Sequence, residues 1–257
     1  MKVMITAGST VERIDRVRSI SNISTGKLGS LIADAFSSVQ DIEEIYYLCN
    51  KTAILPRSER VTIITIDNVT SLESVIKDVC NRVQIDIVIH SMAVSDYCVN
   101  KITSVSIIAK TLAPKLDLLK DEQITETALL PLLYVSIDES SIDDTRKISS
   151  NIDDMLLFMR RTPKVISIFQ NISPKSILVG FKLLDTVPHE VLIDTGFHVL
   201  QENKCNFVLA NDLSKINEKS HVGYLIDGKK NYQRLATKKE IANAIVNVTI
   251  AERKKQK

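Results

Sequence analysis

Glycine is scarce in this chain, which has seven glycines among 257 residues and none between Gly29 and Gly180. So few glycines are expected only where the backbone needs a positive φ or a close approach to another group. Three of them, Gly8, Gly26 and Gly29, fall within residues 6–29. Neither G-x-G-x-x-G nor G-x-x-x-x-G-K-[ST] fits this stretch, which excludes the usual dinucleotide fingerprint and the P-loop.

An excess of charge is also missing, because 33 basic residues face 31 acidic ones and the net charge is +2. The chain therefore has no overall field that would attract nucleic acid or an anionic membrane surface. It has no apolar run near the ~18 residues of a membrane span and no signal-type segment after Met1. We expect a cytoplasmic protein with neither nucleic-acid nor membrane partners.

Metal and disulfide motifs are absent from the sequence as well. The four cysteines lack C-x-x-C spacing, and the four histidines are equally dispersed. This dispersal argues against a zinc site and indicates reduced thiols. With 44% hydrophobic and 25% charged residues, the composition is that of an ordinary globular protein. We predict one α/β domain over residues 1–257.

Short apolar runs alternate with stretches of helical spacing in the first part of the chain. The pattern predicts strands at residues 2–6, 42–49, 61–67 and 86–92, and helices at 27–38 and 70–83. Such alternation is typical of a Rossmann-like, doubly wound, mostly parallel sheet. Ligands in these sheets bind beyond the carboxyl ends of the strands. The loops at 6–29 and 92–97 are therefore expected to face the same crevice.

The second part of the chain is less regular. Residues 98–146 contain no glycine and are interrupted by Pro114 and Pro131, so we interpret them as an inserted lid or dimerisation arm. After this insertion the pattern predicts helices at 151–161, 163–170 and 188–203, and strands at 177–183 and 206–209. A C-terminal hairpin at 221–236 and a helix at 237–254, capped by Thr237 with Glu240, complete the chain.

Residues 6–29 join the first strand to a helix, which suits an anion site. A helix that opens after such a loop offers unpaired backbone N–H groups and the positive end of its dipole, so the expected ligand is a phosphate. Within the loop, Arg18 can bind a carboxylate or phosphate with two hydrogen bonds. The alternative is that Arg18 merely pairs with Asp15.

The sequence of this stretch, TAGSTVERIDRVRSISNISTGKLG, resembles the signature of phosphopantothenate–cysteine ligases. Further matching islands follow in the order of that family: Ser91–Tyr97, Lys147, Thr162–Lys164, Val179–Lys182 and Ala210–Asp212. The resemblance implies a ligase that joins 4′-phosphopantothenate to L-cysteine in coenzyme A biosynthesis. It implies an acyl-nucleotidylate formed from CTP, or from ATP, with release of pyrophosphate, and it implies Mg²⁺ as a cofactor.

The resemblance also assigns roles to the matching residues. It makes Asn22, Arg18 and Lys147 catalytic: Asn22 would hold the acyl-nucleotidylate, Arg18 would help to bind substrate or release product, and Lys147 would be a flap lysine of the first half-reaction. The implied nucleotide-binding residues are Gly8, Ser24, Gly26, Gly29, Asp96, Pro163, Phe181 and Asn211. Phosphopantothenate would contact Asn22, Ala93 and Asp96, and Asp96 would also serve Mg²⁺. The family builds this site across a homodimer interface.

The chain departs from the family pattern at two places. Ser9 stands where the family usually has glycine. The helix before Asn211 usually carries lysines, whereas here it offers Gly196, His198 and Glu202, with only Lys204 nearby. Bacterial relatives are often fused to a flavin decarboxylase, and because Met1 directly precedes the first strand we expect the stand-alone ligase.

Other interpretations of the same residues remain. The missing lysines are compatible with a non-catalytic nucleotide-binding protein of the same fold. Tyr97 and Lys101 match the Y-x-x-x-K pair of short-chain NAD(P)-dependent dehydrogenases, which requires both residues on a long helix. Phe181 could be a core residue, Asp96 a helix cap, and Asn211 part of a strand-ending turn.

Overall fold

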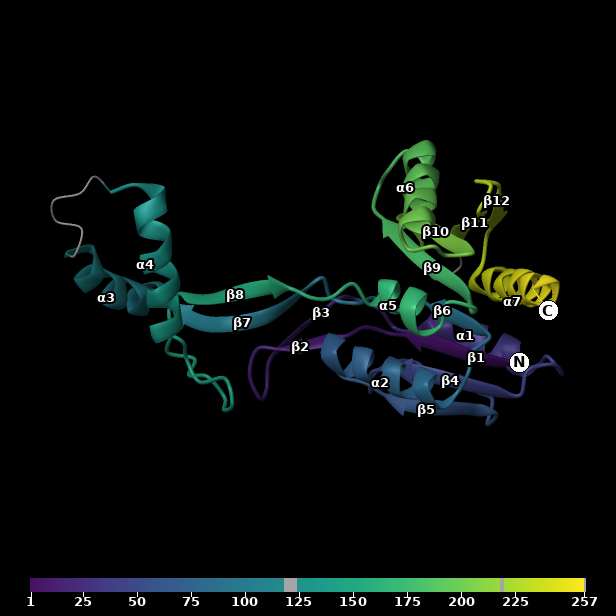
Figure 1. Cartoon of the computed structure of the whole chain (residues 1–257), viewed down its shortest axis with the longest axis horizontal. Coiled ribbons are helices and arrows are strands. Elements are labelled where there is room, and N and C mark those ends of the chain that lie inside the picture. Colours follow the sequence, from purple (N-terminus) through teal and green to yellow (C-terminus); the bar gives the residue numbers. More distant parts are fainter. Residues whose placement is uncertain (118–123, 218–219, 257) are drawn as a thin grey trace. The chain divides into compact units, whose positions relative to one another are not determined.

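The computed structural model describes residues 1–117, 124–217 and 220–256 (Figure 1). The chain divides into two compact units. The first unit comprises Met1–Thr10, Asn22–Val94 and Lys164–Lys257, and the second comprises Val11–Ser21 and Ser95–Pro163. The predicted insertion at 98–146 lies within the second unit.

The first unit is built on an eight-stranded sheet in the order β12-β11-β10-β9-β6-β1-β4-β5. Its strands are β1 (Lys2–Ala7), β4 (Glu44–Cys49), β5 (Val61–Thr65), β6 (Ile87–His90), β9 (Ile177–Leu184), β10 (Phe207–Ile216), β11 (His221–Asp227) and β12 (Tyr232–Leu235). Six neighbouring strands of this sheet pair in parallel, in the spatial order β10-β9-β6-β1-β4-β5. β11 pairs antiparallel with β10, and β12 pairs antiparallel with β11. The predicted α/β fold with a mostly parallel sheet is therefore confirmed.

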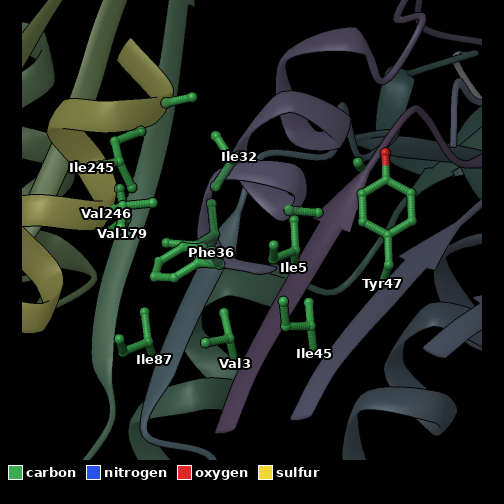
Figure 2. Packing of buried hydrophobic residues seen from close by; sticks show 14 of the residues in the cluster. Val3, Ile5, Ile32, Phe36, Ile45, Tyr47, Ile87, Val179, Ile245 and Val246 are labelled. Carbon is green, nitrogen blue, oxygen red and sulfur yellow. The ribbon is translucent and has the colours of Figure 1, made fainter. Parts of the chain in front are cut away.

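Helices cover both faces of this sheet because successive side chains of a strand point to opposite faces. On one face, α1 (Lys27–Ser37) and α7 (Lys238–Lys255) pack on alternate residues of the strands. Figure 2 shows Ile32 and Phe36 of α1 packed against Val3 and Ile5 of β1. On the other face lie α2 (Val69–Arg82), α5 (Val165–Ile172) and α6 (His189–Glu202).

The second unit contains two antiparallel pairs of strands. β2 (Val11–Arg13) pairs with β3 (Ser19–Ser21), and β7 (Tyr97–Ser104) pairs with β8 (Met155–Arg161). Between β7 and β8 come α3 (Val105–Leu116) and α4 (Glu126–Glu139), which contact each other at one end of the β7–β8 ribbon (Figure 1). Pro114 and Pro131 lie inside these helices rather than ending them.

The helix predicted at residues 151–161 is wrong, since β8 begins at Met155. The run Met155–Phe158 has good helix formers, but β7 offers a complete ladder of partners, from Ser104 opposite Met155 to Tyr97 opposite Arg161. Extended backbone is also favoured at Thr162, because a residue that precedes a proline avoids the helical region. Tertiary pairing therefore overrides local propensity here.

The remaining predicted elements agree with the structure within a few residues, with one further difference. β10 continues to Ile216, so Asn211 and Asp212 lie inside a strand and not in a strand-ending turn. Thr237 caps α7 as predicted. The carboxylate of Glu240 accepts a hydrogen bond from the N–H of Ala236 rather than from that of Thr237. Among the described residues, no helix combines the length and apolar character required to cross a membrane.

Candidate functional site

Gly8 and Gly26 meet at the carboxyl edge of the sheet, where the first loop closes on the start of α1. Both have positive φ, 79° and 71°, which a side chain would strain. A Cβ on Gly26 would lie 3.1 Å from Gly8 N, so the two glycines pack directly on each other. We call Gly8, Gly26 and the first turn of α1 the glycine cradle.

The first turn of α1 leaves backbone donors for a ligand. Gly26 is its N-cap and supplies no side-chain cap, although the N–H of Lys27 donates to Thr25 Oγ1 at 3.4 Å. Gly29 lies in the same turn, packed closely on Ala7 of β1. The N–H groups of a helix start and the positive end of its dipole attract anions, so a phosphate at this place stays the prediction.

The loop after β6 forms the second side of the cradle. Ala93 donates its N–H to Gly8 O (2.9 Å), and its own carbonyl accepts from Thr10 N (3.3 Å). Nδ2 of Asn22 donates to Val94 O at 3.2 Å. The structure thus brings Gly8, Asn22 and Ala93 together, so the loops after β1 and β6 meet as predicted. That they form one ligand site stays a prediction.

Two residues of the β4 end support the cradle, and the sequence analysis missed both. The hydroxyl of Tyr47 lies 2.9 Å from Ile54 O and 3.3 Å from Gly26 O. Burial raises the pKa of Tyr47, so the hydroxyl remains a donor. Asn50 is buried beneath Gly8: its Nδ2 donates to Thr52 Oγ1 (3.1 Å), whereas its Oδ1 has no partner among the described residues. A polar residue that ends a buried strand is the only sequence signal for Asn50.

His90 ends β6, the strand beside β1, and is buried. Its Nδ1 lies 2.9 Å from Thr6 Oγ1, and its ring packs edge-on against Phe169. Burial lowers the pKa of His90 to about 4. His90 is therefore neutral near pH 7, and it adds no positive charge to the site.

Phe181 and Asn211 lie on the face of the sheet that α1 and α7 cover. Phe181, on β9, is half-buried against the core of that face. Asn211, on β10, is buried, and its Nδ2 lies 3.1 Å from Nε2 of His221. Burial, then the nearby Lys238, lower the pKa of His221 to about 4, so neutral His221 accepts from Asn211. The hydrogen bond with His221 thus sets the orientation of the Asn211 side-chain amide.

Asp212, the neighbour of Asn211, has a structural role. Its carboxylate accepts from the N–H groups of Thr186, Val187 and Ser214. Burial acts to raise the pKa of Asp212, but these hydrogen bonds outweigh it and lower the pKa to about 2.

Four predicted site residues belong to the second unit: Arg18, Asp96, Lys147 and Pro163. Asp96 is exposed, and its carbonyl accepts from the N–H of Thr162, which brings Asp96 and Pro163 near each other. Arg18 pairs with Asp15, as in the alternative interpretation of the sequence, and Lys147 is exposed. The other predicted residues, Gly8, Asn22, Ser24, Gly26, Gly29, Ala93, Phe181 and Asn211, belong to the first unit.

The structure clarifies both departures from the family pattern. Ser9 does not have a positive φ, so this position does not require glycine. Lys204 follows α6 and precedes β10, at the amino edge of the sheet and away from the cradle. α6 packs on Ala210 and Ile226, on the face opposite Asn211. Lys204 therefore does not replace the lysines that the family usually carries on this helix.

The dehydrogenase interpretation also fails on geometry. Tyr97 and Lys101 lie on strand β7 and not on a helix. On a strand with a bulge between Val99 and Lys101, their side chains do not have the spacing of one helical turn.

The donor set fits a metal that arrives with its ligand. Among the described residues, no group of three or more His, Cys, Asp or Glu side chains could enclose a metal ion. Mg²⁺ is commonly held by one or two carboxylates together with substrate phosphates. A single exposed carboxylate such as Asp96 suits that second arrangement.

Comparison with known proteins identifies relatives along the whole chain. The family model described as the DNA/pantothenate metabolism flavoprotein C-terminal domain matches residues 1–129 and 139–252. The crystal structure of the DNA/pantothenate metabolism flavoprotein from Streptococcus pneumoniae is 30% identical, covers 98% of this chain and 99% of that chain, and superposes with a TM-score of 0.78.

Two further similarities are more distant. The coenzyme A biosynthesis bifunctional protein CoaBC of Methanocaldococcus jannaschii is 25% identical over 256 residues, which cover 95% of this chain and 49% of that protein. The chain thus spans about half the length of the curated relatives it matches. A Cab2 variant in complex with phosphopantothenate-cysteine shares the fold, with 15% identity, a TM-score of 0.68 and coverage of 99% of this chain and 86% of that one.

Proposed function

Because the chain belongs to the DNA/pantothenate metabolism flavoprotein C-terminal domain family, we propose that it is a phosphopantothenate–cysteine ligase of coenzyme A biosynthesis. One observation carries the proposal: the signature residues Gly8, Asn22 and Ala93 lie close together beside the start of α1. Gly8 accepts from the N–H of Ala93, and Asn22 donates to the carbonyl of the adjacent Val94. The relatives named for coenzyme A biosynthesis and the Cab2 complex with phosphopantothenate-cysteine give the substrate class.

The proposed reaction has two steps. A carboxylate oxygen of 4′-phosphopantothenate attacks the α-phosphorus of CTP or ATP, and the bond from this phosphorus to pyrophosphate breaks. The amine of L-cysteine then attacks the acyl carbon, loses a proton and displaces the nucleoside monophosphate. Both steps require the anionic reactants to be held in line and the charge that develops in the transition state to be compensated. Neither step requires a nucleophile from the protein.

The glycine cradle suits the phosphates in this scheme. Free N–H groups of α1 would donate to the phosphate oxygens, and Asn22 would hold the activated acyl group beside Ala93. β1 and β10 are separated by β6 and β9. Three strand spacings of about 4.8 Å put the cradle roughly 14 Å from Asn211, a span that suits an extended nucleotide. Phe181 and the Asn211 carbonyl oxygen would then contact the nucleoside.

Mg²⁺ would enter with the triphosphate, with Asp96 as its protein carboxylate, and would neutralise charge on the phosphates. We propose CTP as the nucleotide, with ATP as the second candidate. We further propose a cytoplasmic homodimer in which the segment at 98–146 contributes the arm, supported by exposed apolar side chains on α4.

Pyrophosphate release from the 257-residue chain alone tests the proposal, including its independence from a fused decarboxylase. The protein is incubated with Mg²⁺ and phosphopantothenate, with CTP or ATP, each with and without cysteine. We expect release that requires phosphopantothenate, with sustained turnover only when cysteine is present.

The same assay separates the alternative function. Folded protein that binds CTP or ATP in calorimetry but releases no pyrophosphate with either nucleotide would be the non-catalytic nucleotide-binding protein. Pyrophosphate release at the same rate with and without phosphopantothenate would contradict the ligase proposal.

A further inference from the structure

Arg18 and Asp15 form a densely hydrogen-bonded polar pair in the second unit. Oδ1 of Asp15 accepts from the N–H groups of Val17 and Arg18, both at 2.8 Å. Oδ2 accepts from Nε (3.0 Å) and Nη2 (2.6 Å) of Arg18. One edge of the guanidinium is therefore committed to Asp15 and is not available to grip a substrate with two bonds.

The same pair reaches a residue 130 positions further along the chain. Oδ2 of Asp15 also accepts from the N–H of Ile148 (3.1 Å), and Nη2 of Arg18 donates to the carbonyl of Ile148 (3.0 Å). Both backbone polar groups of Ile148 are thus held by one ion pair. We call this arrangement the Ile148 clamp.

Burial makes the clamp stiff. The carboxylate of Asp15 has no exposed surface, and Ile148 is buried in an apolar cluster with Ile14 and Ile102. The Arg18 guanidinium, helped by backbone N–H donors, outweighs burial and holds the pKa of Asp15 far below its usual range. A buried carboxylate that lost its donors would be strongly destabilised, so these bonds stay closed.

Lys147 directly precedes the clamped residue. The N–H of Ile148 belongs to the same planar peptide unit as the Cα and carbonyl of Lys147, so fixing this N–H fixes the base of the Lys147 side chain. Residues 140–154, between α4 and β8, form no helix or strand that could do so instead. The side chain of Lys147 itself is exposed.

We propose that Asp15 and Arg18 are positioning residues for Lys147, which they hold through the backbone of Ile148. The inference rests on the proposed function for the role of Lys147 as the cation of the first half-reaction. Arg18 then contributes to nucleotidyl transfer through Lys147 rather than by touching the substrate.

Kinetics of the first half-reaction test this role. Arg18→Ala and Asp15→Asn should lower the single-turnover rate of pyrophosphate release roughly 10- to 100-fold, the scale of a misplaced catalytic group. Lys147→Ala should lower the same rate, and Arg18→Ala added to Lys147→Ala should lower it little further. KM for phosphopantothenate should change little. Arg16→Ala is the matched control, since Arg16 is an exposed arginine of the same loop.

Hydrogen exchange of the Ile148 amide provides a readout that does not depend on activity. Exchange should be at least about 10-fold faster in Arg18→Ala than in Arg16→Ala. Amide exchange requires local opening, and loss of Arg18 makes opening of the Ile148 clamp easier. Unchanged exchange would overturn the clamp. A raised KM for phosphopantothenate with an unchanged single-turnover rate, or full additivity with Lys147→Ala, would overturn the positioning role.

Failure of the proposed function would be recognisable separately. Wild-type protein that releases no pyrophosphate would contradict the ligase proposal, and with it the role of Lys147. Exchange at Ile148 would still confirm or refute the clamp in that case.

Discussion

Because Gly8 has no side chain, the first loop can lie close to the end of β4. A Cβ at this position would lie 2.5 Å from Asn50 Oδ1 and 2.9 Å from the Cβ of Ala53. Neither neighbour can withdraw easily, since Asn50 is buried and tied to Thr52. The close contact and the positive φ coincide at the residue that also accepts the Ala93 N–H.

Gly8→Ala should therefore destabilise the protein and weaken nucleotide binding. Strain at positive φ and the contact with Asn50 together should cost roughly 1–3 kcal/mol in the free energy of unfolding. Urea unfolding and calorimetric titration with CTP and ATP measure the two effects. Gly228→Ala is the matched control, because a Cβ there meets nothing within 4 Å. Equal losses in the two variants would contradict the cradle.

Sequence reasoning at this scale succeeded where a residue belongs to an ordered signature. Gly8, Asn22 and Ala93 were expected to lie close together, and hydrogen bonds between the two loops bring them near one another. Asn50 and His221 carry no such signal, because each acts through a partner that only the sheet brings near. The pairing of Arg18 with Asp15 was predicted as an alternative. The hydrogen bond from Arg18 to Ile148 spans 130 positions, so no local sequence pattern indicates it.

Among the elements, α7 depends on a polar tie as well as on its apolar face. Arg253, near its C-terminus, donates from Nε (2.9 Å) and Nη2 (2.7 Å) to Asp86 Oδ1, and from Nη1 to the carbonyl of Lys175. Asp86 also accepts from the N–H of Lys2 at the start of β1. Burial acts to raise the pKa of Asp86, but these donors outweigh it and lower the pKa. One carboxylate thus ties α7 to β1.

Arg253→Met should cost about 2–3 kcal/mol in the free energy of unfolding, because it leaves the partly buried Asp86 without its cation. Lys254→Met removes the neighbouring exposed pair with Asp41 and should cost less than about 1 kcal/mol. Denaturant unfolding of both variants checks the difference. Similar costs for the two would show that the tie contributes no more than a surface pair.

Elements with strong periodicity were predictable, whereas the second unit was not. β1, α1 and α2 have apolar spacing that reflects one buried face, so their type could be derived locally. β8 looked helical because its residues favour helix and its partner β7 lies more than 50 positions away. The helices α3 and α4 each contain a proline, which masked their pattern.

For the whole molecule, the oligomeric state can be measured directly in solution, and we propose a homodimer. Light scattering at micromolar concentration should give twice the mass of one chain. Leu130 and Tyr134, one turn apart on α4, are exposed apolar residues of the proposed arm. Tyr134→Asp should shift the protein toward monomer, whereas Val191→Asp, at an exposed apolar position on α6, should not. A monomeric wild type would refute the dimer.

The division of the chain into two interleaved units also has a consequence during synthesis. Residues 11–21 leave the ribosome well before residues 95–163, with which they form the second unit. At about 5–20 residues per second, the intervening stretch takes roughly 4–15 s to translate. Throughout that interval the β2–β3 hairpin has neither β7 nor Ile148 to pack against, and a lone two-stranded hairpin is barely stable in water. The residues of the second unit are therefore all synthesised before Lys164–Lys257 complete the first unit, and Arg18 gains its last partner only when Ile148 emerges.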